Sequence, residues 1–248
     1  MDAKFLSFKF PGIDNVYCAF QMRSERHEDN PYSGGNISFD VGDDPKSVAR
    51  FRKALRKKLG FSHWLEMKQV HGDAVVFDPE GGGIGEPGEI EADGQATNRP
   101  GHALVVKTAD CQPILVAHAE GGHVLAVHAG WRGNVAGLPA KAVTEFCQHY
   151  GLSPESCMAV RGPSLSPSVS EFKNFAAEFG DEFSSYYDQE TMTVDLWRLT
   201  RDQLMSAGLP ESRIFGLDIC TYSNPGLLYS YRRRKISGRQ ASLIWISE

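Results

Sequence analysis

Two histidines and one cysteine stand in motifs that are rich in glycine and polar residues: His71 in KQVHG, Cys111 in TADCQPIL and His128 in AVHAGWRG. Imidazole nitrogens and thiolates are ligands that zinc prefers in proteins. Three such ligands leave one coordination position open, which distinguishes a catalytic zinc site from a structural site closed by four protein ligands. If the three side chains converge, we expect a metal-dependent enzyme with His71, Cys111 and His128 as its catalytic residues.

Each of these residues has a more ordinary interpretation when it is taken alone. A lone cysteine is commonly a buried core residue, and a lone histidine is commonly hydrogen-bonded within the fold. His71 precedes Cys111 by forty positions, so no local clip of the CxxC kind can form the site. The fold has to assemble it, and assembled sites are typical of function rather than of structural stabilisation.

The segments around Cys111 and His128 are expected to form a β-hairpin. Two apolar, β-prone runs, 113–117 and 123–127, are separated by a connection of five residues with two glycines. Such a connection favours a hairpin. If Ala117 faces His123, Cys111 lies opposite Ala129, or opposite His128 with a slip of one residue. A slip of one residue would turn the side chains to opposite faces of the sheet.

The remaining pattern predicts an α+β fold with mixed sheets in layers flanked by helices, in a single domain over residues 1–248. The clearest helix covers 44–59, with Pro45 in its first turn and Gly60 after its end. A regular doubly wound sheet is disfavoured because helices do not follow most of the strands. Further helices are expected at 134–149, 169–179 and 195–207, strands at 67–77, 103–107, 113–117, 123–128, 157–161, 213–218 and 240–246, and a glycine-rich loop bordering the site at 80–89.

Composition excludes several classes of protein. The formal charge of −5 argues against general nucleic-acid binding, and no apolar run is long enough for a membrane span. The first residues lack signal-peptide features, and the five cysteines form no CxxC pair, so we expect a cytoplasmic protein without disulfides. The basic run 232–235 is expected to be a solvated face, with the alternative that one of its arginines faces an anionic substrate.

A resemblance to a known family covers nearly the whole chain. The motifs QVHG, ADG, TADCQPIL, AVHAGWRG, GPSLSP, CTYSNP and SYRRRKISGRQASLIWI occur in the order seen in the YfiH family, also called laccase-domain or multicopper polyphenol oxidase domain proteins. The resemblance implies that His71, Cys111 and His128 are zinc ligands. It implies phosphorolysis of purine nucleosides (adenosine, inosine, guanosine and methylthioadenosine), with adenosine deamination in relatives. It also implies layered mixed sheets, and one bacterial branch is described as a peptidoglycan editing factor.

Phosphorolysis requires a cradle for phosphate and a proton donor for the departing base. We expect the cradle to involve Arg23, Asn36 and Arg132, the last in a GWRGN turn that opens a helix. Glu171 matches a family position and is a candidate for proton transfer. Asp110 is expected either to orient a ligand histidine or to cap a turn. Three of the candidates also have an interpretation without function: Arg132 and Glu171 as solvated charges, and Asn36 as a turn residue. The partners are therefore expected to be a nucleoside and phosphate, with a monomer and a homodimer both open.

The chain departs from the family pattern at several positions. Ser24-Glu25-Arg26 stands where relatives have a glycine pair, so the loop after Arg23 differs, and the role that the resemblance implies for Arg23 is less well supported. Ser38 replaces a usual glycine, and Lys107 and Gln112 replace apolar residues around the TADC core. The three metal ligands match.

Three other functions remain open. A laccase would need several coppers and paired HxH histidines, whereas this chain has eight histidines and no HxH, although copper can occupy an N/S site in the test tube. A Cys-His hydrolase that edits peptidoglycan precursors would use Cys111 as nucleophile and His128 as base. A structural zinc protein would need a fourth ligand, for which the candidates are His27, His102, His118 and His123.

Overall fold

The computed structural model describes residues 3–24, 29–80 and 83–248, and within them the strands form two large mixed sheets and one short ribbon. The five-stranded sheet has the order β1 (Lys4–Phe8), β2 (Val16–Met22), β13 (Gln240–Ile246), β6 (His102–Thr108), β3 (His63–Glu66). The six-stranded sheet has the order β12 (Ile214–Gly216), β9 (Cys157–Arg161), β7 (Gln112–His118), β8 (Val124–Ala129), β5 (Gly94–Thr97), β4 (Val75–Phe77). The ribbon pairs β10 (Tyr187–Asp188) with β11 (Thr193–Val194).

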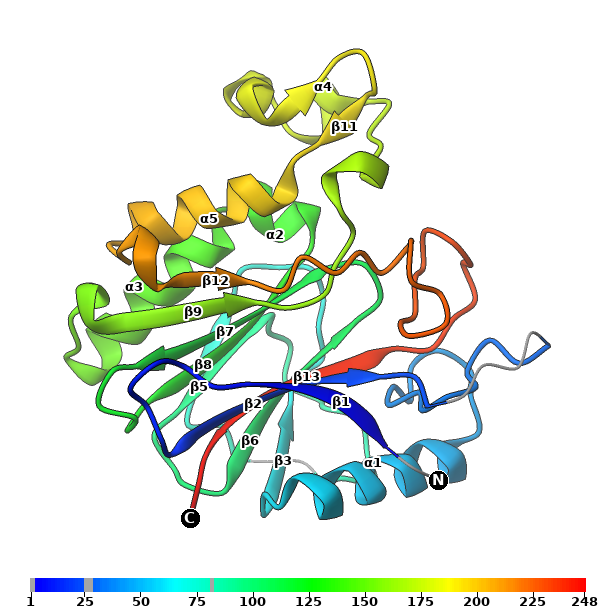
Figure 1. The fold of residues 1–248 in the computed structure, drawn as a ribbon, viewed down its shortest axis with the longest axis vertical. Coiled ribbons are helices and arrows are strands. Elements are labelled where there is room, and N and C mark those ends of the chain that lie inside the picture. The colour runs from blue at the N-terminus through cyan, green and yellow to red at the C-terminus, as the bar shows by residue number, and fades with distance from the viewer. Residues whose placement is uncertain (1–2, 25–28, 81–82) are drawn as a thin grey trace.

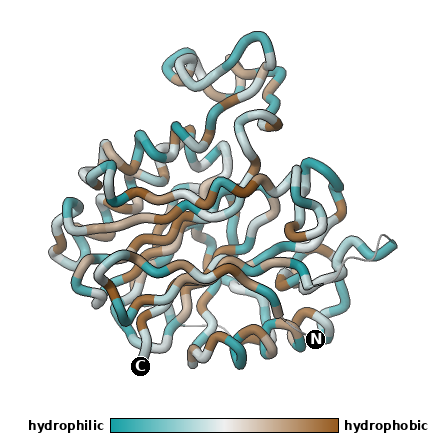
Figure 2. The backbone as a smooth tube through the Cα atoms, viewed as in Figure 1, coloured by the Kyte–Doolittle hydropathy of each residue, from teal (hydrophilic) through white to brown (hydrophobic). Residues whose placement is uncertain are grey.

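The two large sheets pack face to face, with helices on their outer faces (Figure 1). Apolar side chains of β2, β6 and β13 meet those of β7, β8 and β9 in the central core. Helix α1 (Pro45–Leu59) covers the five-stranded sheet, while α3 (Leu138–Tyr150) and α5 (Leu196–Ser206) cover the six-stranded sheet. Figure 2 shows the hydrophobic residues concentrated along the central strands. The predicted α+β fold with layered mixed sheets is confirmed.

Helix α1 confirms the helix predicted over 44–59, and both of its ends are capped. The Asp44 carboxylate accepts hydrogen bonds from the backbone N–H groups of Lys46 and Ser47 at the start of the helix. Gly60 ends it in the left-handed conformation at φ 82° and donates its N–H to the Arg56 carbonyl.

Other elements differ from the sequence predictions. The helix expected over 134–149 is divided into α2 (Trp131–Val135) and α3, because Gly137 adopts a left-handed φ of 72° between them. The strand expected over 67–77 is confined to β4, since residues 67–74 form the loop that carries His71. Strands β1, β2, β3, β5, β10 and β11 were not predicted. Of the helix expected over 169–179, α4 (Phe175–Glu178) is its only α-helical part.

Residues 171–194 form a projecting arm, visible at the top of Figure 1 around α4 and β11. An aromatic cluster attaches the arm to the body and includes Phe172, Phe175 and Phe179, with Trp131 packed against it. Large aromatic side chains bury much area with few rotatable bonds. The arm is therefore held by ring packing.

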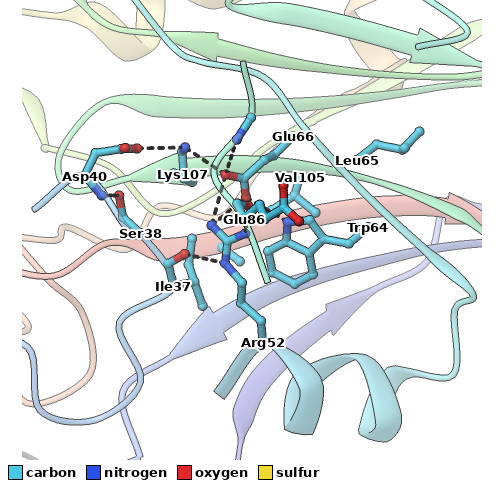
Figure 3. Close-up of polar contacts among 12 residues, drawn as sticks. Ile37, Ser38, Asp40, Arg52, Trp64, Leu65, Glu66, Glu86, Val105 and Lys107 are labelled. Atoms are coloured by element: carbon cyan, nitrogen blue, oxygen red, sulfur yellow. Dashed lines mark hydrogen bonds and ion pairs between the residues drawn. The ribbon is translucent and has the colours of Figure 1, made fainter. Parts of the chain in front are cut away.

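A buried ion-pair network joins α1 to the five-stranded sheet (Figure 3). The fully buried guanidinium of Arg52 lies 2.7 Å from a carboxylate oxygen of Glu66, and the Lys107 ammonium lies 3.1 Å from the other. The Trp64 indole also donates to Glu66. Removing one member of a buried pair costs about 3–5 kcal/mol. The buried charge of Lys107, which replaces an apolar residue before the TADC motif, is thus paired with the Glu66 carboxylate.

Candidate metal centre

The structure brings His71, Cys111 and His128 together. Their ligand atoms all lie within 4.8 Å of one another, and the Cys111 Sγ is 3.8 Å from the His71 Nε2. Cys111 directly precedes β7, His128 lies in β8, and His71 lies in the loop between β3 and β4. Two imidazoles and a thiol at this separation are chemically suited to a borderline metal such as zinc.

The β7–β8 hairpin forms as predicted, but its register is displaced by one residue. Ala117 pairs with Val124 rather than His123, and Gln112, not Cys111, pairs with Ala129. Cys111 therefore lies just beyond the last pair, beside Gly130. A Cβ atom at Gly130 would be 3.0 Å from both the Cys111 Sγ and a carbon of the His71 ring, so any larger residue there would crowd the cysteine and His71.

The buried carboxylate of Asp93 holds two of the three ligands. One oxygen accepts a hydrogen bond from the His128 Nδ1 at 2.7 Å and another from the His71 backbone N–H at 3.1 Å. The other oxygen accepts from the N–H groups of Val70 and Gly72. These bonds stabilise the left-handed backbone of His71, whose φ of 60° is uncommon for a residue other than glycine. They also leave the Nε2 of His128 as its ligand atom.

The side chain of Gln69 fastens the His71 loop to β6. Its amide donates to the Lys107 carbonyl and accepts from the Lys107 N–H, both at 2.8 Å. Lys107 lies four residues before Cys111. The glutamine thus pairs with β6 as a neighbouring strand would, and it sets the distance between the His71 loop and the cysteine segment.

The three side chains polarise one another. Burial alone would raise the pKa of the Cys111 thiol, but the nearby His128 and His71 outweigh burial and lower it to about 6. Burial alone would lower the pKa of His128, but Cys111 and then Asp93 raise it to about 9. The cysteine is therefore favoured as a thiolate, which is the form that binds metals.

A cleft of about 490 Å³ opens over this centre. His71, Cys111 and Gly130 lie at its floor, and its walls come from helix α2, the projecting arm and the segment 231–235. The lining includes the aromatic residues Trp131, Phe172 and Tyr231, together with charged residues of both signs. A cleft of this size with aromatic walls and convergent polar groups is typical of a small-molecule site.

Two of the four predicted substrate residues, Arg132 and Glu171, line the cleft. Arg23 and Asn36 do not line it. The Arg23 guanidinium donates to the carbonyls of Ser33 and Pro225. It also lies 4.6 Å from the centre of the Tyr229 ring. The Asn36 side chain binds backbone groups of Ser38 and Arg239. Both therefore support loops in this structure.

Asp110 does not orient a ligand histidine. Its carboxylate accepts hydrogen bonds from the Thr221 hydroxyl and the Arg232 backbone N–H, both at 2.6 Å. It does not cap a turn either, because its two partners lie 111 and 122 positions further along the chain, and it joins the cysteine segment to them. The sequence analysis missed Asp93 as the orienting carboxylate, although the ADG motif and the common carboxylate–histidine–metal arrangement could have indicated it.

None of the candidate fourth ligands that the structure describes joins the group. The three-residue group His71, Cys111 and His128 is the only such cluster found in residues 3–24, 29–80 and 83–248. His118 and His123 lie at the opposite end of the β7–β8 hairpin, and His102 stacks on His63 at 4.2 Å. His27 lies outside the described residues.

Comparison with known proteins places the chain in a family. A family model described as multi-copper polyphenol oxidoreductase laccase matches residues 17–247. The chain belongs to this family. It is 36% identical to the purine nucleoside phosphorylase YfiH of Shigella flexneri, over 87% of this chain and 88% of that protein. It is 31% identical to the purine nucleoside phosphorylase PA4543 of Pseudomonas aeruginosa, over 96% and 97% of the two chains.

Solved structures agree with this family membership. The Neisseria meningitidis protein NMB0706 superposes with a TM-score of 0.84 at 28% identity, covering 98% of this chain and 99% of that one. YlmD of Geobacillus stearothermophilus superposes with a TM-score of 0.85 at 25% identity, covering 96% and 94%. In the described residues, no helix combines the length and apolar character that a membrane crossing requires.

Proposed function

We propose that this chain is a zinc-dependent purine nucleoside phosphorylase acting on adenosine, inosine, guanosine and methylthioadenosine. The observation that carries the proposal is a three-ligand group of two imidazoles and one thiol, of which His71 and Cys111 line an aromatic, partly cationic cleft. Three ligands leave a coordination position available to a substrate. The family relatives that bear the name purine nucleoside phosphorylase support the choice of substrate class.

The donor set fits zinc. Imidazole nitrogens and thiolates are zinc ligands, and three protein ligands are typical of catalytic zinc sites, while the hydrogen bond from His128 to Asp93 supplies an outer partner for that histidine. Zinc held by the three ligands would supply a Lewis acid and a positive charge at the cleft floor. The chain itself supplies orientation, because Asp93 sets the backbone of His71 and the ring of His128 together.

Phosphorolysis breaks the bond between the base nitrogen and C1′ of the ribose and forms a bond from a phosphate oxygen to the same carbon. The departing base must gain a proton, and Glu171 in the cleft wall is our candidate for its delivery. The rings of Trp131, Phe172 and Tyr231 offer apolar surface for the purine. Arg132 is our candidate from the sequence for binding phosphate.

Product analysis tests this proposal. Purified protein with measured zinc content is given adenosine with and without phosphate, and products are separated by chromatography. We expect adenine only when phosphate is present. Inosine formed without phosphate would instead show an adenosine deaminase, which is the second activity that the resemblance implies.

A copper oxidase is less consistent with the site. Multicopper chemistry needs several metal centres, whereas the described parts of the chain hold one three-ligand group. Copper also outcompetes zinc at most N/S sites, so oxidase activity of copper-loaded protein would not identify the function.

One specific observation favours a second function, a Cys-His hydrolase that edits peptidoglycan precursors. Asp93, His128 and Cys111 stand in the order carboxylate, imidazole and thiol, with the Nδ1 of His128 bound to Asp93. This is the arrangement of an activated nucleophile. Such an enzyme would remain active after chelation of metal, whereas the phosphorylase would not.

A further inference from the structure

The basic segment 232–235 does not form a uniform solvated face. Arg232 and Lys235 line the cleft above the metal centre. Arg233 lines a separate cavity of about 250 Å³, and its guanidinium donates to the Tyr222 carbonyl and lies 4.2 Å from the Tyr222 ring. The neighbouring Arg232 and Arg233 thus line two different cavities, so Arg233 can serve as a matched control for substitutions of Arg232.

Arg232 is anchored at both of its ends. Its backbone N–H donates to the Asp110 carboxylate at 2.6 Å, and its guanidinium donates to the Glu171 carbonyl at 3.0 Å. The guanidinium also lies 5.8 Å from the Phe172 ring. Since Asp110 directly precedes Cys111, these contacts tie Arg232 to the cysteine segment and to the projecting arm. An arginine held in this way loses little entropy when it binds a ligand.

The charge of Arg232 has no carboxylate partner within the described chain, where its one side-chain hydrogen bond goes to a backbone carbonyl. The acidic groups of the cleft are Asp110, Glu171 and Glu178. Both oxygens of Asp110 accept other hydrogen bonds, and the Glu171 carboxylate pairs with Lys173 at 3.4 Å. A guanidinium with several free N–H groups in a cleft is a recognition element for a dianion.

We propose that Arg232 binds the phosphoryl dianion in this cleft, with Lys235 contributing at the rim. The proposal deepens the proposed function, on which it rests, by assigning the phosphate to Arg232 rather than to Arg132. The Arg132 side chain is exposed, lies 4.2 Å from the Trp131 ring and has no hydrogen bond to another described residue. Arg232 is half-buried and anchored, so the same charge is better preorganised there.

Equilibrium dialysis with radiolabelled inorganic phosphate tests this assignment on zinc-quantified protein. The variants are Arg232→Gln, Arg132→Gln and the control Arg233→Gln, with thermal melting to verify folding. Charge-assisted hydrogen bonds of this kind lead us to expect phosphate binding weakened about thirty-fold in Arg232→Gln. Arg233→Gln should bind phosphate like the parent, and Arg232→Lys should weaken binding less than Arg232→Gln. Unchanged binding in Arg232→Gln, or the largest loss in Arg132→Gln, would overturn the proposal.

Two further readouts separate this inference from the proposed function. If the parent protein lacks phosphorolysis, the proposed function fails, while the dialysis still decides whether Arg232 binds phosphate. Competition by a nucleoside 5′-monophosphate distinguishes free phosphate from a phosphoryl group attached to the nucleoside. If the monophosphate binds more tightly than the nucleoside, and this difference is lost in Arg232→Gln, then Arg232 binds a phosphoryl group that is attached to the nucleoside. Loss of both ligands equally in Arg233→Gln would contradict it.

Discussion

The two ends of the β7–β8 hairpin both carry histidines, yet their surroundings differ. At one end, the buried His128 lies beside Cys111 and His71, and these two line the cleft. At the other end, the rings of His118 and His123 are 6.3 Å apart, and His123 packs against Tyr150 at 4.6 Å. Histidine content therefore does not distinguish the two ends.

The carboxylates near each end explain the difference. Asp93 accepts a hydrogen bond directly from the Nδ1 of His128, which orients the ring and leaves its Nε2 as the nitrogen available to a metal. Asp78, near the other end, accepts instead from Thr97 and from the Tyr150 hydroxyl. The two ends therefore differ in the carboxylate that orients His128 and in the thiol and second imidazole beside it.

Removing a predicted zinc ligand from the His128 end of the hairpin should have the largest effect on zinc content and turnover. We expect Cys111→Ala and His128→Ala to lose their zinc and to reduce nucleoside turnover by more than about a hundred-fold, which exceeds the usual effect of outer partners. His123→Phe, at the other end, should retain zinc and turnover. Metal analysis and product chromatography on the same preparations measure both quantities. Zinc retained in Cys111→Ala would contradict the assignment of the ligands.

Exchanging the two carboxylates for amides should give the next largest effect. Asp93→Asn should weaken zinc binding about 10–100-fold, because it disturbs the bonds to His128 and to the His71 loop. Asp78→Asn should lower the melting temperature without changing zinc affinity. Competition with a chromogenic chelator measures the affinity. Equal zinc affinities in the two variants would show that Asp93 has no special part in the centre.

These contacts also show what could be predicted from the sequence. The types of His71, Cys111 and His128, and the hairpin that joins two of them, followed from motifs and periodicity. The register was wrong by one residue, because the connecting loop can close in either way and only the packed sheets decide. Asp93 was missed because its bonds to His71 and His128 depend on a loop with a left-handed residue, and strand and helix periodicities carry no signal for such a loop.

A smaller effect is expected from Gln69, which fastens the His71 loop to β6. Gln69→Leu removes two hydrogen bonds to the Lys107 backbone but leaves the bonds of Asp93 in place. Two neutral hydrogen bonds contribute about 1–3 kcal/mol in total, and because Asp93 still holds the loop, only part of this loss reaches zinc binding, so we expect zinc affinity to fall about ten-fold or less. Chelator competition again provides the measurement. A loss as large as that of Asp93→Asn would mean that Gln69, not Asp93, determines the position of His71.

The smallest effect concerns pH at the far end of the hairpin. Burial, and then the charge of His118, lower the pKa of His123 below its usual value. The unfolded chain then binds a proton more readily than the folded chain, so this group's stabilisation is present above the unfolded pKa and is lost as pH falls through the folded pKa. We expect His123→Phe to lose less stability than the parent between pH 7 and about pH 5. Parallel urea titrations would reveal identical losses if His123 does not contribute.

Zinc restoration tests most directly whether the Cys111 end of the hairpin is a catalytic zinc centre. Protein stripped of metal is titrated with zinc while phosphate-dependent release of purine base is followed, for the parent and for Cys111→Ala. We predict no release from the stripped parent, recovery in proportion to added zinc up to about one equivalent per chain, and none in Cys111→Ala. Full release from stripped protein would contradict the account.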